Sequence, residues 1–297
     1  MIPYGLTIVK ENTLSPRYDE AENVSGLARD VCAALSSIAD ERNMSTLRAV
    51  SAQSAIVVPC YNERARLQVD EFEKFLDSDQ RTCVLIFVDD GSRDQTAFVL
   101  EHIRERHEGQ VVVLHQAVNR GKAEAVRYGI NYAFDQHLPF AGFWDADLAT
   151  PLTAIAPFLD LLTSHPELDM IFGARVRLLG RHIERHASRH YLGRAFATAA
   201  SQVLKLPIYD TQCGAKLFRC TSQTRTVFAK PFLSRWIFDV EIIARYISVM
   251  KSSAEAAQRI YEFPLESWVD VKGSKLGPRD FARAAYDLLR IRREYLR

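Results

Sequence analysis

Cys83-Val-Leu-Ile-Phe-Val-Asp89 is an apolar run, rich in β-branched residues, that ends in a carboxylate. Such a run is typical of a strand buried on both faces of a sheet. Similar runs lie before and after it, and helical patterns separate them, which predicts repeated βαβ units and a mostly parallel sheet of the α/β class. The predicted strands are 55–59, 83–89, 111–114, 140–144 and 170–172, and the predicted helices between them are 69–76, 95–106, 121–134 and 152–164.

The composition is that of an ordinary globular chain. Its 297 residues are 47% hydrophobic and 25% charged, enough for one large α/β domain or two smaller ones. The formal net charge of +1 gives no indication of nucleic-acid binding, and no pattern indicates an oligomeric state. The five cysteines are odd in number and lack metal-ligand spacing, so reduced thiols and a cytoplasmic location are expected. Because no uncharged apolar run reaches about 18 residues, any membrane contact is expected to be peripheral, on the cytoplasmic face.

Three segments of the chain differ in residue composition and hydrophobic pattern. The first mixes polar residues, prolines and one helical pattern at 24–39 but lacks a strand pattern, so it is an appendage with no assigned role. The last begins with proline and sets apolar residues against arginines at helical spacing, which predicts an amphipathic helix that docks on the protein or on a membrane. The predicted segments are 1–53, the α/β domain at 54–277 with halves at 54–173 and 174–277, and the C-terminal helix at 278–297.

Polar residues follow each of the first four predicted strands. In open α/β sheets, ligands bind at the carboxyl ends of the strands, where these residues would gather. Several carboxylates at one sheet edge repel one another unless a cation or hydrogen-bond donors are supplied, so the coincidence favours a binding site. The four segments are Pro59-Cys-Tyr-Asn-Glu63, Asp89-Asp-Gly-Ser-Arg-Asp-Gln-Thr96, Asn119-Arg-Gly-Lys-Ala123 and Asp145-Ala-Asp147.

Asp145 and Asp147 are the candidate metal ligands. If the backbone after the strand at 140–144 stays extended, their side chains point to the same side, because side chains alternate along a strand. They would then share one hard divalent cation, with substrate phosphates completing its coordination. Oxygen ligands suit both Mg²⁺ and Mn²⁺, so a divalent cation is predicted without a choice between the two.

The four segments, in this order and spacing, resemble the family 2 glycosyltransferases of the GT-A fold. Three later segments resemble more narrowly the dolichyl-phosphate β-glucosyltransferase and polyprenyl-phosphate glycosyltransferase branch. The resemblance covers about residues 55–276 and implies a Rossmann-like, mostly parallel sheet flanked by helices, with an α-rich acceptor-side region. The later segments are Asp210-Thr-Gln-Cys-Gly-Ala-Lys-Leu-Phe-Arg219, Trp236-Ile-Phe-Asp-Val-Glu241, and Trp268 followed by Gly273-Ser-Lys-Leu276.

The resemblance implies a nucleotide-sugar site at the strand ends. Side chains of the first two segments would accept hydrogen bonds from a uracil and a ribose. Lys122, at the start of a helix, would hold this pocket or the pyrophosphate, and Lys275 would reach over the pyrophosphate from a loop. Asp147 would bind the metal, and Asp145 the metal or the ribose. The implied residues are Pro59, Tyr61, Asn62, Glu63, Asp89, Asp90, Ser92, Lys122, Asp145, Ala146, Asp147 and Lys275.

An arginine-rich segment follows the fifth predicted strand. Residues 174–194 contain six arginines, three histidines and a single acid, Glu184. From Arg181 to His190, one arginine and one histidine recur every four residues, which predicts two adjacent stripes on one helix. The segment is interpreted either as a solvated basic face or as a surface for a phosphate acceptor or anionic lipid headgroups. The acceptor-side residues inferred are Arg175, Arg181, Arg185, Arg189, Gln212, Lys216, Trp236, Asp239 and Glu241.

Asp210 is the candidate catalytic residue. Toward a hydroxyl acceptor it would be the general base that removes the proton. A phosphate acceptor is already an anion and needs no base, so Asp210 would then orient the acceptor or balance the arginines. The alternative is that Asp210 caps the turn before a strand at 216–219. Asp239 and Glu241, on a predicted helix, would contact the donor sugar or else pair with Lys216 or Arg219.

These features together predict an inverting glycosyltransferase. It would transfer a hexose, with glucose favoured, from a UDP-sugar to a polyprenyl or dolichyl phosphate, with a divalent cation stabilising the departing diphosphate. One alternative is a sugar or lipid hydroxyl as the acceptor. The other is a GT-A domain that binds a nucleotide or a membrane without turnover. A dinucleotide-binding dehydrogenase is disfavoured because the sequence has no Gly-x-Gly-x-x-Gly turn.

Overall fold

The computed structural model describes residues 52–78, 83–184, 187–271 and 278–296. Contacts divide the chain into Met1–Arg42 and Asn43–Arg297, and every described residue lies in the second unit. The appendage and its helix at 24–39 lie outside the described residues, apart from Ala52 and Gln53. The three predicted segments therefore stay predictions.

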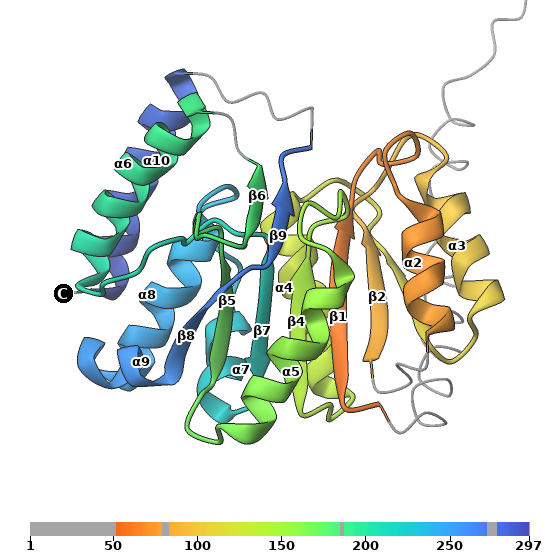
Figure 1. The fold of residues 1–297 in the computed structure, drawn as a ribbon, viewed down its shortest axis with the longest axis horizontal. Coiled ribbons are helices and arrows are strands. Elements are labelled where there is room, and N and C mark those ends of the chain that lie inside the picture. The colour runs from red at the N-terminus through yellow and green to blue at the C-terminus, as the bar shows by residue number, and fades with distance from the viewer. Residues whose placement is uncertain (1–51, 79–82, 185–186, 272–277, 297) are drawn as a thin grey trace, which may run out of the picture. The chain divides into compact units, whose positions relative to one another are not determined.

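A central sheet of seven strands organises the described part of the chain (Figure 1). Its order is β3-β2-β1-β4-β7-β5-β8, and β7 is antiparallel to both neighbours while the other pairs are parallel. The predicted mostly parallel α/β sheet is confirmed. The strands are β1 (Ser54–Cys60), β2 (Cys83–Asp89), β3 (Val111–His115), β4 (Phe140–Trp144), β5 (Met170–Ala174), β7 (Ala215–Arg219) and β8 (Ile260–Pro264).

Helices connect the strands and cover both faces of the sheet (Figure 1). The four helices predicted between the first five strands are present, and the fourth begins with a short 3-10 turn, η1 (Leu152–Ala154). The helices are α2 (Val69–Asp77), α3 (Thr96–Arg106), α4 (Lys122–Asp135), α5 (Ile155–Ser164), α6 (Ala187–Leu204), α7 (Ser222–Phe228), α8 (Phe238–Met250), α9 (Ser253–Arg259) and α10 (Pro278–Tyr295).

Alternation along the strands divides the core into two layers. Val57 of β1 packs in the layer that contains α4, α7 and α8, whereas Ile56 and Val58 pack in the layer that contains α2, α3 and α5. Side chains on successive strand positions point to opposite faces, and here both faces are covered by helices. This is why the strands appear in the sequence as continuous apolar runs.

The strand order reverses at β1. The chain places β2 and β3 on one side of β1 and β4 on the other. Ligands bind at such a switch point, outside the carboxyl ends of the strands. The polar segments after these four strands all lie at this carboxyl edge, which is the upper edge in Figure 1.

The C-terminal helix α10 docks on the protein. Its side chains Ala284, Leu288 and Ile291 are buried, and the helix packs against α6 and α8 (Figure 1). Ser234 Oγ donates to a carboxylate oxygen of Asp287 at 2.7 Å. Of the two expectations for this amphipathic helix, docking on the protein is confirmed.

The predicted stripes of arginine and histidine do not lie on one helix. Arg181 and His182 lie in a turn and in β6 (His182–Glu184), while the helix α6 begins only at Ala187. β6 pairs in parallel with β9 (Ser267–Val269), far along the chain, in a separate two-stranded sheet. The single-helix prediction is wrong because this long-range pairing, which buries Ile183, overrides the local four-residue spacing.

Four of the five cysteines lie among the described residues. Cys60, Cys83, Cys213 and Cys220 are free thiols. Burial raises the pKa of Cys83 to about 12, which keeps this thiol protonated and unreactive. Within residues 52–296 as described, no helix has the length and apolar character that crossing a membrane requires.

Candidate active site

The loops after β1 and β2 are joined by hydrogen bonds between side chains and backbone. The Asn62 N–H donates to Ser92 Oγ at 3.0 Å, and the Arg93 N–H donates to Asn62 Oδ1 at 2.8 Å. Asn62 takes a φ of 53°, a left-handed conformation that asparagine tolerates better than most residues. The Glu63 N–H donates to Thr96 Oγ1 at 2.9 Å. Residues predicted separately at two strand ends therefore form one continuous wall.

Asp89 is buried at the end of β2 and is held by two donors. The Ser92 N–H donates to Asp89 Oδ1 at 3.0 Å, and His115 Nδ1 lies 3.3 Å from Asp89 Oδ2. His115 Nε2 lies 2.8 Å from Glu101 Oε1. Hydrogen bonds to Asp89 and Glu101 raise the pKa of His115 to about 9, so its ring is charged at neutral pH. Burial works against the ionised form of Asp89, but His115 and Ser92 outweigh burial and lower its pKa.

Asp90 holds the loop that leads into α4. Its two carboxylate oxygens accept hydrogen bonds of 2.6 and 2.7 Å from the Arg120 and Gly121 N–H groups. Gly121 has a φ of 94°, which favours glycine. Burial raises the pKa of Asp90, and the two backbone donors oppose the rise. Asp90 therefore acts on the site by holding the loop that positions Lys122, the first residue of α4.

A hydrogen-bonded turn carries Asp145 and Asp147. β4 ends at Trp144, the Asp145 N–H donates to Gly214 O at 3.0 Å, and the Leu148 N–H donates to Asp145 O at 3.1 Å. The extended backbone assumed for this pair is therefore wrong, because the chain turns as soon as β4 ends. The two carboxylates still interact: burial raises the pKa of Asp147, and the charge of Asp145 raises it further.

Lys122 forms an ion pair with Asp145 across the site. It is the first residue of α4, as predicted, and its side chain is 41% exposed. Burial opposes the charge of Lys122, but Asp145 and Asp239 outweigh burial and raise its pKa. A Cβ atom on Gly214 would lie 2.0 Å from an oxygen of Asp145, so only glycine leaves room for this carboxylate.

The turn fits a divalent cation held by two carboxylates. Asp145 and Asp147 are half-buried, and burial, followed by the charge of Asp145, raises the pKa of Asp147. Among the residues that the structure describes, no group of three or more His, Cys, Asp and Glu side chains is placed to hold a metal ion. A cation here would take its other ligands from bound phosphates and water, as Mg²⁺ commonly does.

Asp210 and Arg175 form a buried, bidentate ion pair at the acceptor side. Arg175 Nε lies 2.6 Å from Asp210 Oδ2, and Arg175 Nη2 lies 2.7 Å from Oδ1. The Gln212 N–H donates to Asp210 Oδ1 at 3.1 Å, which gives Asp210 a turn-capping role as well. The guanidinium group lies 5.1 Å from the centre of the Trp268 ring. Burial opposes the charge of Arg175, but Asp210 outweighs burial and raises its pKa.

Lys216 is wholly buried on β7. Its Nζ donates to Asp239 Oδ1 at 2.6 Å and to Cys213 O at 2.5 Å. It lies 5.3 Å from the centre of the Phe143 ring and 5.2 Å from that of Phe172. The predicted pairing of Asp239 with Lys216 is confirmed. The burial of Lys216 corrects the expectation that its side chain contacts an acceptor.

Glu241 is also wholly buried, on α8. Its carboxylate accepts hydrogen bonds from the Leu233 and Ser234 N–H groups and pairs with Arg245 at 2.7 Å. It therefore fixes the segment before α8, and its burial corrects the expectation that it contacts a sugar or an acceptor. Trp236 is half-buried in the same segment and packs against the core.

The remaining predicted residues fall into three groups. Tyr61 is 39% exposed beside the wall formed by the first two loops, and Arg181 pairs with Glu266 at 2.9 Å. Pro59 and Ala146 are structural neighbours of the site, within β1 and within the turn after β4. Lys275 and the side chains of Arg185 and Arg189 lie outside the described residues.

His115 and Gly214 are site residues that the sequence analysis missed. His115 ends β3 and reaches Asp89 on the neighbouring strand, a contact that the paired register of β2 and β3 creates. Gly214 precedes β7 and touches Asp145 through the antiparallel pairing of β4 and β7. Both signals depend on strand pairing and are absent from the local sequence. Gly214 lies inside the segment 210–219, one of those that resemble the glycosyltransferase family, and a glycine there was the one local sign of a close contact.

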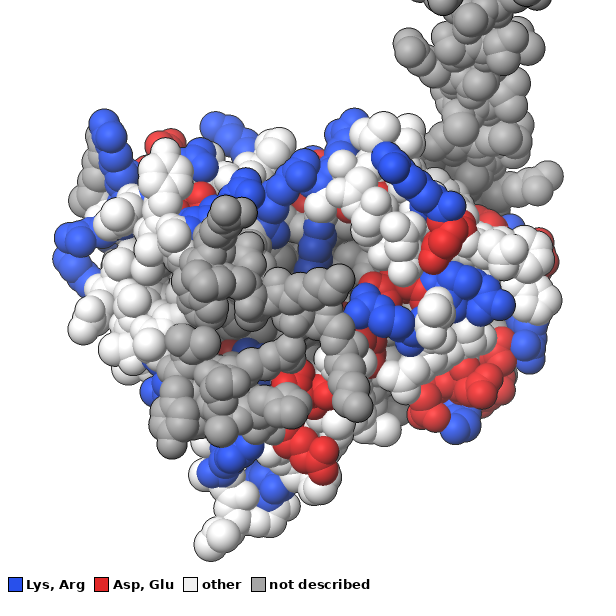
Figure 2. Space-filling model, turned by 90° about the horizontal axis from the view of Figure 1, so that it is seen from above, with Lys and Arg blue, Asp and Glu red and all other residues white. Residues whose placement is uncertain are grey.

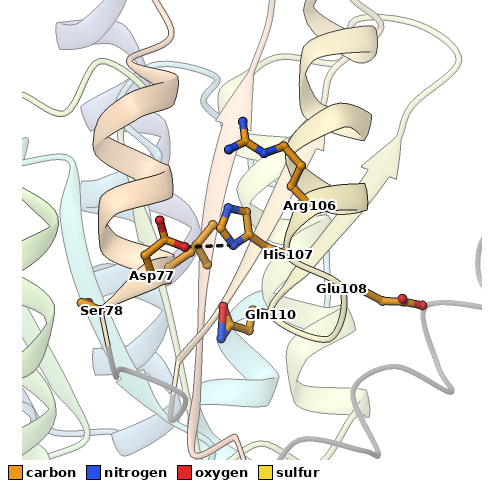
Figure 3. Close-up of a pocket in the computed structure, with 7 residues that line it drawn as sticks. Asp77, Ser78, Arg106, His107, Glu108 and Gln110 are labelled. Atoms are coloured by element: carbon orange, nitrogen blue, oxygen red, sulfur yellow. Dashed lines mark ion pairs between the residues drawn. The ribbon is translucent and has the colours of Figure 1, made fainter.

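A cavity of about 350 Å³ lies away from these residues (Figure 3). It is lined by the ends of α2 and α3, where Asp77 and His107 lie 3.9 Å apart, at the amino ends of the strands. None of the predicted site residues lines it. The candidate site is instead the open carboxyl edge.

A mostly parallel sheet whose switch point carries an Asp-x-Asp turn defines the GT-A class of folds. The chain belongs to glycosyl transferase family 2, because the model of that family, "Glycosyl transferase family 2", matches residues 55–223. The chain is 34% identical to the dolichyl-phosphate β-glucosyltransferase of Mus musculus, over 82% of this chain and 76% of the mouse protein. It is 31% identical to the enzyme of the same name from Dictyostelium discoideum, over 82% of this chain and 74% of that protein.

Solved structures share the fold at low sequence identity. Glucosyl-3-phosphoglycerate synthase from Mycobacterium tuberculosis, in complex with Mn²⁺, UDP-glucose and phosphoglyceric acid, superposes with a TM-score of 0.58 at 14% identity, over 84% of this chain and 80% of that chain. A mannosyltransferase from Pyrobaculum calidifontis, in complex with GDP-mannose and Mn²⁺, gives 0.53 at 17% identity, over 81% and 62%. These likenesses confirm the predicted GT-A fold.

Proposed function

We propose that this glycosyltransferase moves glucose, with inversion, from UDP-glucose to a dolichyl or other polyprenyl phosphate. The observation that carries the proposal is one continuous edge on which the Asp145–Asp147 turn lies between the wall at Asn62 and the Arg175–Asp210 pair. The curated relatives named dolichyl-phosphate β-glucosyltransferases support the hexose and the acceptor. The complex of a fold relative with Mn²⁺ and UDP-glucose supports the donor and the cation.

The donor would lie against the wall formed by the first two loops. The Asn62 side chain and the buried Asp89 carboxylate offer acceptors for a nucleobase N–H or a ribose hydroxyl. Because these groups are fixed by backbone donors, little conformational freedom is lost when the nucleoside binds. This pre-organisation supports a nucleotide as the ligand of this part of the edge.

The diphosphate would lie over the turn after β4. Bound Mg²⁺ or Mn²⁺, held by Asp147 and Asp145, would supply Lewis-acid stabilisation of the leaving diphosphate. Lys122, at the first turn of α4, presents an ammonium group where the helix N-terminus already favours anions. Its partner Asp145 keeps this ammonium at the site in the absence of substrate.

The acceptor side favours a phosphate over a hydroxyl. Asp210 has both oxygens bound to the Arg175 guanidinium, which stabilises the ionised carboxylate and makes it a weak base. A phosphate acceptor needs no base, so Asp210 would act by orienting Arg175, whose charge attracts the acceptor. Because a dolichyl chain stays in the bilayer, the proposal also places the enzyme peripherally at a membrane surface, on the cytoplasmic face.

The test is transfer of labelled glucose. We would incubate the full chain with UDP-[¹⁴C]glucose, dolichyl phosphate, detergent and MnCl₂ or MgCl₂, and extract with organic solvent. We expect label in the organic phase, its loss with EDTA, and weaker transfer from UDP-galactose, UDP-N-acetylglucosamine and GDP-mannose. Label that enters only a water-soluble glycoside would contradict the lipid acceptor, and label released only as free glucose, by transfer to water, would contradict the transferase.

A further inference from the structure

Two adjacent leucines occupy the first two positions of an exposed turn between β5 and β6. Leu178 is 50% exposed and Leu179 is fully exposed, at 105%. The Arg181 N–H donates to Leu178 O at 3.1 Å, and Gly180 takes the φ of 83° that closes such a turn. Turn tips usually carry Gly, Pro, Asn, Asp or Ser. A leucine pair at this position presents apolar surface directly to the surroundings.

The turn starts at the acceptor side of the site. β5 ends at Ala174, and the next residue, Arg175, pairs with the buried Asp210. The chain then leads directly from this ion pair to the exposed leucines. If an acceptor phosphate binds near Arg175 while its hydrocarbon chain stays in a bilayer, the membrane surface must lie close to this turn.

Several exposed arginines lie on loops at the same carboxyl edge of the sheet as the turn. Figure 2 looks onto this edge and shows Lys and Arg side chains spaced around a hollow. Exposed acids are fewer, and one of them, Glu266, pairs with Arg181 at 2.9 Å. Arg235, which precedes α8, lies at the edge because its side chain approaches Gly121. The exposed arginines on these loops are Arg64, Arg93, Arg120, Arg177 and Arg235.

We propose that the Leu178–Leu179 turn, together with the adjacent exposed Arg177, docks on an anionic lipid bilayer. The two leucines would enter the boundary between headgroups and acyl chains, and Arg177 would contact anionic headgroups. This orientation places the part of the carboxyl edge that carries Arg175 against the membrane. The reason for such a surface rests on the proposed lipid acceptor. The binding itself needs only a lipid bilayer and can be measured without donor or acceptor.

The test measures binding to vesicles that contain neither donor nor acceptor. The full chain is mixed with vesicles of phosphatidylcholine, with or without about 30 mol% phosphatidylserine, and the bound fraction is measured by flotation. We expect the Leu178→Ser/Leu179→Ser variant to bind anionic vesicles about tenfold or more weakly. Arg177→Gln should weaken binding severalfold, and should leave a smaller dependence on salt between about 0.1 and 0.5 M.

Leu289→Ser is the matched control. Leu289 is 63% exposed on α10, so this variant removes a leucine of similar exposure from another surface. It should bind vesicles like the unaltered chain, and all variants should keep its melting temperature because the substituted side chains are exposed. The inference is overturned if the double variant binds anionic vesicles as well as the unaltered chain does, if Leu289→Ser weakens binding equally, or if the leucine pair instead controls self-association in sedimentation.

Failure of the surface and failure of the proposed function give different results. The double variant should retain glucose transfer to dolichyl phosphate dissolved in detergent, where no bilayer is needed. Transfer in detergent without turn-dependent vesicle binding would contradict the docking surface and support the proposed function. Turn-dependent vesicle binding without any lipid product would contradict the proposed function and support the docking surface.

Discussion

The donor side and the acceptor side of the carboxyl edge treat charge in opposite ways. On the donor side, Asp145 and Asp147 share a half-open turn in which Lys122 forms its ion pair with Asp145, and burial, followed by the charge of Asp145, raises the pKa of Asp147. On the acceptor side, Asp210 is matched by Arg175 and Asp239 by Lys216, in buried ion pairs. The donor side is therefore built to be completed by a ligand, whereas the acceptor side is completed within the chain.

The largest effect should follow from removing the donor-side charge. Asp147→Asn keeps the shape of the turn but removes a metal ligand, and we expect the transfer rate to fall about a thousandfold or more, because a bound cation supplies several kcal/mol of charge stabilisation. We also expect UDP with Mn²⁺ to raise the melting temperature of the unaltered chain and not that of the variant.

Asp135→Asn is the control for that substitution. Asp135 is 73% exposed and pairs only loosely, at 3.3 Å, with Arg225 on the surface. This variant should keep both the rate and the Mn²⁺-dependent rise in melting temperature. A full Mn²⁺ response in Asp147→Asn would show that the turn is not the metal site, and the contrast between the two sides would then fail.

Breaking the buried ion pair on the acceptor side should lower the stability of the fold. Arg175→Met leaves Asp210 buried without its ionic partner, and we expect the free energy of unfolding to fall by about 3 to 5 kcal/mol in urea denaturation. In the double variant Arg175→Met/Asp210→Leu, most of this loss should return, because no unpaired charge remains. Both the single and the double variant should fail to transfer glucose to the lipid acceptor.

A surface pair provides the comparison for that experiment. Lys74 and Glu71 pair at 2.6 Å on α2, with the Lys74 side chain 71% exposed, so Lys74→Met should leave the unfolding curve unchanged. If Arg175→Met is as mild as Lys74→Met, the Arg175–Asp210 pair is open to water and the acceptor side is not internally completed.

The contrast also explains what could be predicted from the sequence. On the donor side, each binding residue stands next to the strand that positions it, as Asp89 follows the run that begins at Cys83. Parallel strands buried on both faces have an unmistakable apolar pattern, and the rule that ligands bind at their carboxyl ends then locates the site. The fold, and the position of these residues at the carboxyl edge, therefore followed from local signals.

The acceptor side depends on contacts between distant residues. Arg175 finds Asp210 only because β5 and β7 are paired, and the Arg181–His190 spacing misled because β6 pairs with β9 instead of continuing a helix. Nothing near Lys216 in the sequence indicates that its ammonium group is buried between two aromatic rings. Periodicity reports local geometry alone, so it could neither pair Arg175 with Asp210 nor choose between the two roles left open for Asp239.

Gly214 links the two sides, and its substitution should have an intermediate effect. In Gly214→Ala, the new Cβ would meet Asp145 at 2.0 Å, so the carboxylate must move. We expect kcat to fall about a hundredfold, the scale associated with a displacement of about 1 Å in an active site. Adding Gly214→Ala to Asp145→Ala should cost little more, because the displaced group is already gone. Fully additive losses would indicate that Gly214 acts elsewhere.

The smallest expected effect concerns His115, the donor-side exception to the contrast. His115 is paired with Asp89 and Glu101, and Glu101 is also held by Arg104 at 2.6 Å, so a completed charge network lies beside the open turn. The pKa of His115 is raised from about 6.5 to about 9. Its stabilising contribution is therefore complete below about pH 6.5 and is lost as the pH rises through about 9.

Calorimetric titration with UDP and Mg²⁺ between pH 7 and 10 would measure this loss. We expect UDP affinity to fall severalfold across pH 9, because neutral His115 stabilises the ionised Asp89 less. His115→Gln can still donate to Asp89 but does not titrate, so it should remove the pH step at a modest cost in affinity. His102→Gln, an exposed residue on α3, should keep the step. If the fall in UDP affinity near pH 9 persists in His115→Gln, another group titrates there. The contact with His115 would then contribute little to the ionised Asp89.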